Sequence, residues 1–210
     1  MKKFFLISTT IIILLVTILT TGGCRTNAAV TYVAAEFIGS DFELVLPEKW
    51  EGGTKKELDS VAEDLKEAGR AEIADKVVAS KKDLLFFGYD TEDVISNDVI
   101  STLTICGEPS GSISLEEYIE ISYKNIASSY EEAGYDFKII EKDIVPLGNY
   151  NETGRFIIEQ TVDGIKTKVV QYIVKHKNDF WVLTFTAEPG KFDENIEKFD
   201  ETFESFKIID

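Results

Sequence analysis

The sequence predicts an α+β domain in which helices pack on an antiparallel sheet that contains a meander. Three observations support this class. Four β-type segments follow one another late in the chain, and two capping-box patterns stand before apolar residues at helical spacing. The last segment places a phenylalanine or isoleucine at every third or fourth position. No long linker interrupts residues 36–210, so we expect a single domain there.

The first part of this domain alternates short strands with helices. Residues 42–46 are β-rich and end at Pro47. Residues 54–57 (TKKE) form a capping box, and the apolar residues behind them keep helical spacing as far as Gly69, a typical helix stop. A second helical segment, 71–79, follows, so this stretch predicts a helical hairpin or a kinked helix.

The middle of the domain predicts two strands and one long helix. The β-rich runs 84–89 and 99–106 are separated by the polar segment 90–98, which we predict to be an exposed turn. Residues 114–117 (SLEE) form the second capping box and begin a helix that Gly134 closes.

The last third predicts the meander and a helix that covers it. The short connections between the last three strands are typical of hairpins. An amphipathic helix with a phenylalanine-rich face then needs an apolar surface, and the sheet is the one available. The four predicted strands span residues 137–145, 155–162, 166–175 and 180–187.

Residues 1–23 have the features of a cleaved export signal. Two lysines precede an uncharged apolar run, and a Gly-Gly pair stands directly before Cys24. A thiol at that position can take a diacylglyceryl group, whose two chains give stable anchoring. We therefore predict a bacterial lipoprotein in which Cys24 is the lipidation site, residues 24–35 are the tether, and the domain lies on the extracytoplasmic face of the cell membrane.

Two other interpretations of this leader stay open. A plain signal peptide cut nearby would make Cys24 incidental, and an uncleaved anchor would keep the leader in the bilayer. The apolar residues 4–19 fall short of the roughly 20 that a spanning helix needs. Thr21 stands where the lipobox usually has leucine, which is a departure from the pattern.

The composition is acidic. The chain has 22 Lys+Arg against 38 Asp+Glu, a formal net charge of −16. Removal of residues 1–23 takes away two lysines and no acid, which leaves 20 against 38, or −18. We expect no nucleic-acid partner, because such a charge repels phosphates. Solubility is the general effect of this charge, and recruitment of a cationic partner or of divalent ions is the alternative.

Few residues offer chemistry, so we predict no catalytic residue, no cofactor and no metal site. Cys106 lies in an apolar run and is expected to be a small buried hydrophobe. The single histidine, His176, lies in or beside a predicted turn, and a structural zinc site needs about four Cys or His ligands. The acidic segment 90–98 lacks the glycine and glutamate of an EF-hand loop, which leaves cation binding there an open question.

Three short stretches, in their order along the chain, resemble the PsbP-like fold, which DcrB-like bacterial lipoproteins share. They are residues 42–50 (FELVLPEKW), 114–118 (SLEEY) and 180–186 (FWVLTFT), and the resemblance covers about residues 36–208. The helical stretch 54–79 is longer than the family's usual connection. The resemblance implies a small accessory or binding module, and it carries no ligand-binding residue over to this chain.

These observations lead to two hypotheses about function. The first is a noncatalytic, membrane-tethered module that engages an envelope protein or a small ligand outside the cytoplasm. The alternative is a hydrolase of envelope material that uses carboxylates, because only carboxylates are abundant enough here to supply an acid and a base.

Overall fold

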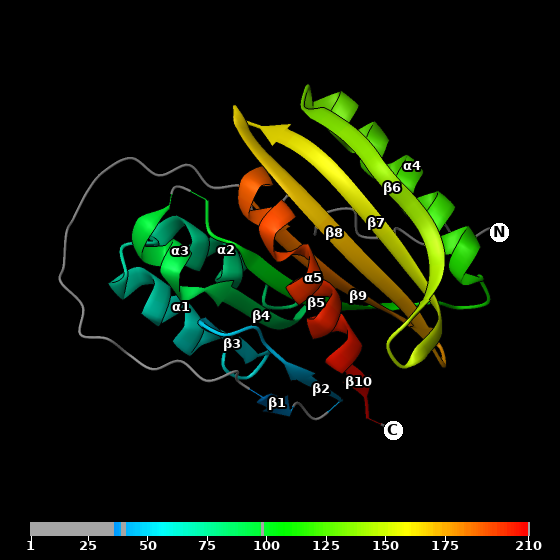
Figure 1. The fold of residues 1–210 in the computed structure, drawn as a ribbon, viewed down its shortest axis with the longest axis horizontal. Helices are drawn as coiled ribbons and strands as arrows, with labels where there is room; N and C mark the ends of the chain where they lie inside the picture. The colour runs from blue at the N-terminus through cyan, green and yellow to red at the C-terminus, as the bar shows by residue number, and fades with distance from the viewer. Residues whose placement is uncertain (1–35, 39–40, 98, 210) are drawn as a thin grey trace.

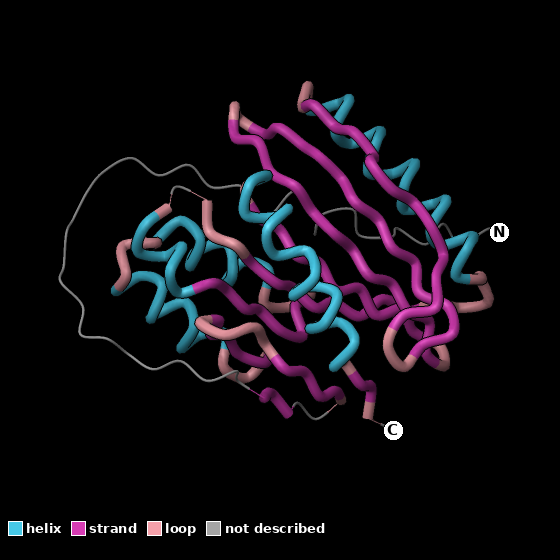
Figure 2. Tube along the Cα trace, in the orientation of Figure 1, coloured by secondary structure: helices cyan, strands magenta, loops and turns pink. Residues whose placement is uncertain are grey.

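The computed structural model describes residues 36–38, 41–97 and 99–209. The predicted signal peptide, Cys24 and the predicted tether 24–35 lie outside the described residues. Within the described part, helices cover both faces of a seven-stranded antiparallel sheet, and a small three-stranded sheet lies beside it (Figures 1 and 2). The predicted α+β class is confirmed.

The large sheet has the strand order β3-β4-β5-β9-β8-β7-β6. Its last four strands in sequence are neighbours in that order, so the predicted meander is confirmed. Asp163 and Gly164 both have positive φ angles, 52° and 83°, as a two-residue hairpin turn requires. The strands are β3 (Trp50–Thr54), β4 (Leu84–Asp90), β5 (Thr102–Pro109), β6 (Asp136–Leu147), β7 (Tyr150–Val162), β8 (Ile165–His176) and β9 (Asp179–Ala187).

The small sheet joins the two ends of the described chain. Its strands are β1 (Glu36–Ile38), β2 (Phe42–Val45) and β10 (Lys207–Ile208), in the order β1-β2-β10. Strand β2 is the predicted strand 42–46, and its buried side chains join the aromatic core of the large sheet.

Helices α4 (Leu115–Ala133) and α5 (Pro189–Ser205) lie on opposite faces of the large sheet. Strand β8 shows this directly, because Val170 and Tyr172 belong to the core under α5, whereas Val169 and Ile173 belong to the core under α4. Three phenylalanines of α5 are buried on the sheet, as predicted: Phe192, Phe199 and Phe203.

The second capping box is present as predicted. The Ser114 Oγ accepts from the Glu117 backbone N–H at 3.1 Å, and the Glu117 carboxylate accepts from the Ser114 N–H at 3.0 Å. Gly134 ends α4 in the left-handed region, with φ 71°.

The helix that follows the first capping box begins later than predicted. Helix α1 (Leu58–Glu67) begins after Glu57, and α2 (Ala71–Ser80) follows it. Thr54 is instead the last residue of β3, and its N–H and hydroxyl donate to the Glu57 carboxylate at 2.9 and 2.8 Å. The pattern therefore stabilises the turn from β3 into the helix rather than capping its first turn.

The prediction of an exposed turn at 90–98 is wrong, because residues 91–96 form the short helix α3 (Thr91–Ser96). The Asp90 side chain accepts from the Glu92 N–H at 2.8 Å at its start. At its end the Arg70 guanidinium donates to the carbonyls of Val94 and Asn97. Arg70 lies outside the segment, and its contacts stabilise a helix that is too short to form alone.

Strand β6 is an edge of the large sheet. Its pairing with β7 is interrupted by register shifts at 139–141 and 145–147, and it carries Lys138, Lys142 and Pro146. Bulges, lysines and proline are features that keep exposed edges from pairing with other chains.

Of the helices in the described part of the chain, not one combines the length and the apolar character needed to cross a bilayer.

Candidate functional site

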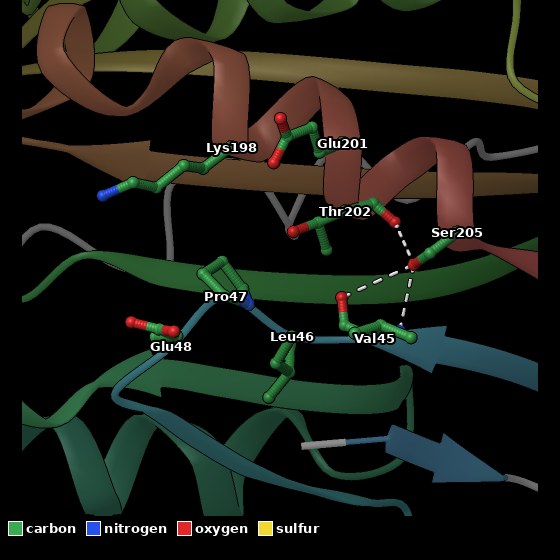
Figure 3. A pocket seen from close by; sticks show the side chains of 8 residues that line it. All are labelled: Val45, Leu46, Pro47, Glu48, Lys198, Glu201, Thr202 and Ser205. Carbon is green, nitrogen blue, oxygen red and sulfur yellow. Dashed lines mark hydrogen bonds between the residues drawn. The ribbon is translucent and has the colours of Figure 1, made fainter. Parts of the chain in front are cut away.

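A groove of about 480 Å³ lies between α5 and the segment that follows β2 (Figure 3). Its volume falls in the range of small-ligand pockets, roughly 300–1,000 Å³. The two walls are far apart in the sequence, and the groove is lined by Val45, Leu46, Pro47, Glu48, Lys198, Glu201, Thr202 and Ser205.

A tight turn shapes the first wall of the groove. Pro47 follows the end of β2, and its carbonyl accepts from the Trp50 N–H at 3.2 Å. Lys49 between them has a φ of 68°, in the left-handed region. Trp50 is buried, and its ring lies 6.0 Å from that of Phe199 on α5. The turn is therefore anchored on the helix that forms the other wall.

Ser205 links the wall formed by α5 to the wall formed by the segment after β2. Its Oγ accepts from the Val45 N–H at 3.0 Å and donates to the Thr202 carbonyl at 2.6 Å (Figure 3). One hydroxyl thus joins the end of β2 to the last turn of α5, and the groove has a fixed width at this end.

The groove combines an apolar base with an excess of negative charge. Glu48 and Glu201 are exposed carboxylates, and Lys198 brings the one cation among the lining residues. The Lys198 ammonium donates to the Asn195 side chain at 2.8 Å, and the nearby Lys49 pairs with Glu92 at 2.7 Å. The lining therefore carries two carboxylates and one ammonium group.

On the sheet side of α5, a second polar cluster holds the helix in place. The Tyr172 hydroxyl and the Arg155 guanidinium both donate to the Asp200 carboxylate, and Arg155 also donates to Glu141. Burial raises the pKa of Tyr172, and the hydrogen bond to Asp200 raises it further. Burial lowers the pKa of Arg155, but Glu141 and Asp200 raise it overall. A neutral tyrosine and a charged arginine therefore clamp α5 to β7 and β8.

Two of the sequence-predicted residues, Cys106 and His176, lie outside the lining of the groove. Cys24 lies outside the described residues. Cys106 is 2% exposed, as predicted for a buried hydrophobe, and burial raises the pKa of its thiol to about 12. The thiol is therefore protonated and a poor nucleophile. His176 is the last residue of β8, opposite Asp179, and is partly exposed.

The acidic segment 90–98 centres on the fully buried Asp93. Its carboxylate accepts from the Ser101 N–H at 2.9 Å and from the Asn97 amide, and it pairs with Lys191 of α5. Protein donors thus occupy its oxygens. Across residues 36–38, 41–97 and 99–209, Cys, His, Asp and Glu form no group of three that could hold a metal ion.

Among the described residues, two carboxyl groups have raised pKa values, Asp90 and Glu108, and burial is the main cause for both. The Asp90 N–H donates to the Ser101 carbonyl. Glu108 lies seven residues after Ser101, on strand β5. At about 3.3 Å per residue they lie roughly 20 Å apart. Carboxylates that act together on a glycosidic bond stand about 5–10 Å apart. These two do not form such a pair.

Changing Glu108 to glutamine is expected to reduce the loss of stability on going from acid to neutral pH. The pKa of Glu108 in the folded state is raised above the usual 4.5, so the folded state holds the proton more tightly than the unfolded state does. The free energy of unfolding therefore falls as the pH rises from about 4.5 through the folded-state pKa. Glutamine keeps an acceptor for Tyr118 without the charge. The variant should be more stable at pH 7, by about 1 kcal/mol or less. Urea unfolding at pH 4 and 7 measures the difference, and an equal effect at both would contradict the prediction.

No protein-family model matches the sequence, and no curated protein matches it. Solved structures do. The chain superposes on cyanobacterial PsbP (CyanoP) from Synechocystis sp. PCC 6803 with a TM-score of 0.56 and 11% identity, covering 90% of this chain and 98% of that one. The fold is therefore PsbP-like, as predicted.

Two further structures share the fold. The Ran-binding protein Mog1p of Saccharomyces cerevisiae has a TM-score of 0.51 and 9% identity, over 87% of this chain and 97% of that one. LpqN of Mycobacterium tuberculosis, a protein involved in cell envelope biogenesis, has a TM-score of 0.50 and 12% identity, over 86% and 90%. Identities this low relate the folds alone.

Proposed function

We propose that this chain is a membrane-tethered extracytoplasmic lipoprotein that acts as a noncatalytic binding or accessory module. The observation that carries the proposal is the Gly-Gly-Cys24 pattern after an apolar run, with the first strand beginning at Glu36. Lipid on Cys24 would hold the domain at the cell membrane, and the groove between α5 and residues 45–48 would bind a protein or a small ligand.

The side chains near the groove support binding rather than catalysis. The Ser205 hydroxyl and the Asp200 carboxylate are engaged in contacts that hold α5. The Cys106 thiol, which lies apart from the groove, is buried and protonated. An envelope role also agrees with LpqN, which shares the fold and is involved in cell envelope biogenesis.

The alternative is a carboxylate-based hydrolase of envelope material. Glu108 is its strongest acid candidate, because burial raises its pKa and Tyr118 hydrogen bonds to it. Turnover of wall or lipid substrates by the full-length protein, abolished in Glu108→Gln, would favour the hydrolase over the binding module.

Replacing Cys24 with alanine tests the tether. The variant is expected to lose palmitate labelling completely and to leave the membrane fraction, because the remaining leader carries no acyl chains. Metabolic labelling and fractionation of cells measure both. Cys106→Ala is the matched control, since it removes the buried thiol and should keep label and location. A Cys24→Ala protein that stays labelled and membrane-bound would overturn the proposal.

A further inference from the structure

Strand β2 is held firmly on one of its two sides. It has β1 on one side and the C-terminal end of the chain on the other (Figure 1). On the C-terminal side the Ile209 N–H donates to the Asp41 carbonyl at 2.9 Å, and Glu43 pairs with β10. The Val45 N–H donates to the Ser205 hydroxyl at 3.0 Å. Every second residue from 41 to 45 is therefore attached to the last residues of the chain.

The other side of β2 has a much smaller attachment to β1. In an antiparallel pair, consecutive residues of a strand direct their backbone groups to opposite sides. Because the backbone groups of Glu43 and Val45 face the C-terminal side, Leu44 between them faces β1. Its partner on β1 is Phe37. Between residues 36–38 and 43–45, this one pair of residues therefore carries the backbone hydrogen bonds that hold β1.

Strand β2 has anchors that do not involve β1. Phe42 and Leu44 are 3% and 1% exposed and belong to the aromatic core under α5. The ring of Phe42 lies 5.9 Å from that of Phe206, at the end of α5. A three-residue edge strand, by contrast, is the kind of segment that opens at a small fraction of the global free energy of unfolding. Loss of β1 therefore leaves β2 and the core in place.

The attachment of β1 sets the length of chain between the domain and Cys24. Cys24 and Glu36 are twelve residues apart, whereas Cys24 and Asp41 are seventeen apart. Asp41 is the first residue that the C-terminal side holds. At about 3.4 Å per residue, release of β1 lengthens the extended chain from roughly 41 to roughly 58 Å.

We propose that β1 is a releasable strap that gives the tether of this protein two lengths. With β1 paired to β2, the domain is held on the short tether. With β1 released, the folded domain reaches roughly 17 Å further and can meet partners beyond the range of the short tether. The change in reach rests on the proposed lipid on Cys24, whereas the release of β1 does not.

Hydrogen exchange at single-amide resolution tests the release. In the full-length protein in lipid nanodiscs, the Leu44 N–H is expected to exchange at least tenfold faster than the N–H groups of Glu43 and Val45, after correction for intrinsic rates. The reason is that Leu44 alone among the three loses its hydrogen bond when β1 leaves. Equal protection of the three amides would show that the small sheet opens as one unit and would overturn the proposal.

Two engineered disulfides provide a matched comparison. Glu36→Cys/Val45→Cys joins β1 to β2 at opposed residues whose Cα atoms lie about 4.5 Å apart, within the range of a disulfide. It should slow exchange of the Leu44 N–H to the rate of its neighbours. Glu43→Cys/Lys207→Cys joins β2 to β10 instead and should leave the fast exchange of Leu44 in place. The same Leu44 rate in both disulfide variants would contradict the strap.

Neutron reflectometry on a supported bilayer tests the two lengths. Phe37→Pro removes the N–H that pairs with Leu44 and keeps β1 released. This variant is expected to extend up to roughly 17 Å further from the bilayer than Glu36→Cys/Val45→Cys does. Equal extension of the two anchored proteins would overturn the two lengths. Protein that does not stay on the bilayer would count against the proposed lipid on Cys24, and the exchange rates would still decide whether β1 is released.

Discussion

Replacing Phe203 with alanine is expected to lower the free energy of unfolding by about 3–5 kcal/mol. The ring is fully buried, stacks on Tyr172 with centroids 4.6 Å apart, and lies 5.8 Å from the ring of Tyr150. It is therefore one of the contacts through which α5 rests on β8. Such a loss is a large part of the 5–15 kcal/mol of a typical domain.

Urea unfolding followed by circular dichroism measures this effect, and the midpoint should fall with little change in slope. Two controls separate the effect of losing the ring from a general effect of substitution in α5. Phe203→Leu refills much of the volume and should lose clearly less, and the exposed Glu197→Ala should stay within about 0.5 kcal/mol. A loss below 1 kcal/mol for Phe203→Ala would contradict the packing described for α5.

Replacing Asp93 with alanine is also expected to lower the free energy of unfolding by about 3–5 kcal/mol, because it breaks a buried ion pair. The carboxylate is fully buried and serves the Lys191 ammonium, the Ser101 N–H and the Asn97 amide. Burial lowers the pKa of Lys191, and the hydrogen bond and charge of Asp93 raise it overall. The Lys191 ammonium therefore stays charged at neutral pH, and its contact with Asp93 ties α3 to the start of α5.

A double-mutant cycle isolates this pair. Lys191→Met leaves the carboxylate buried without its cation, whereas Asp93→Ala with Lys191→Met removes both charges. The double variant should lose at least 1 kcal/mol less than the sum of the single losses. Additive losses, measured by the same urea titration, would show that the two side chains do not act as a pair.

Much of the fold could be predicted from local pattern. The meander, α4 with its capping box and the phenylalanine face of α5 each depend on signals within one segment. Strand β3 could not be predicted, because its Gly52 and Gly53 are typical of loops. A Cβ on Gly52 would lie 2.4 Å from the Phe87 carbonyl, so the close approach of β4 requires glycine inside this strand.

Other elements depend on contacts that the sequence does not reveal. Helix α3 needs Arg70 at its end and Lys191 against Asp93, which are distant in sequence. The groove also depends on residues that are distant in sequence, since Leu46 and Thr202 stand more than 150 positions apart. The stretch 42–50 carries part of the family resemblance, but its pattern alone does not show which residues face α5. The export signal and the tether stay predictions from local sequence, because residues 1–35 lie outside the described part of the chain.

If the lipid anchor proposed above holds copies of this protein on one membrane, the edge strand β6 has a consequence for how those copies pack. Confinement to a surface raises the rate at which neighbours collide side by side, and a flat unpaired strand would then join sheets from molecule to molecule. Its two register shifts and Pro146 interrupt the row of backbone groups that a neighbour would need, and Lys138 and Lys142 place charge beside them. We therefore expect that copies anchored in this way can lie densely on the membrane without stacking into filaments.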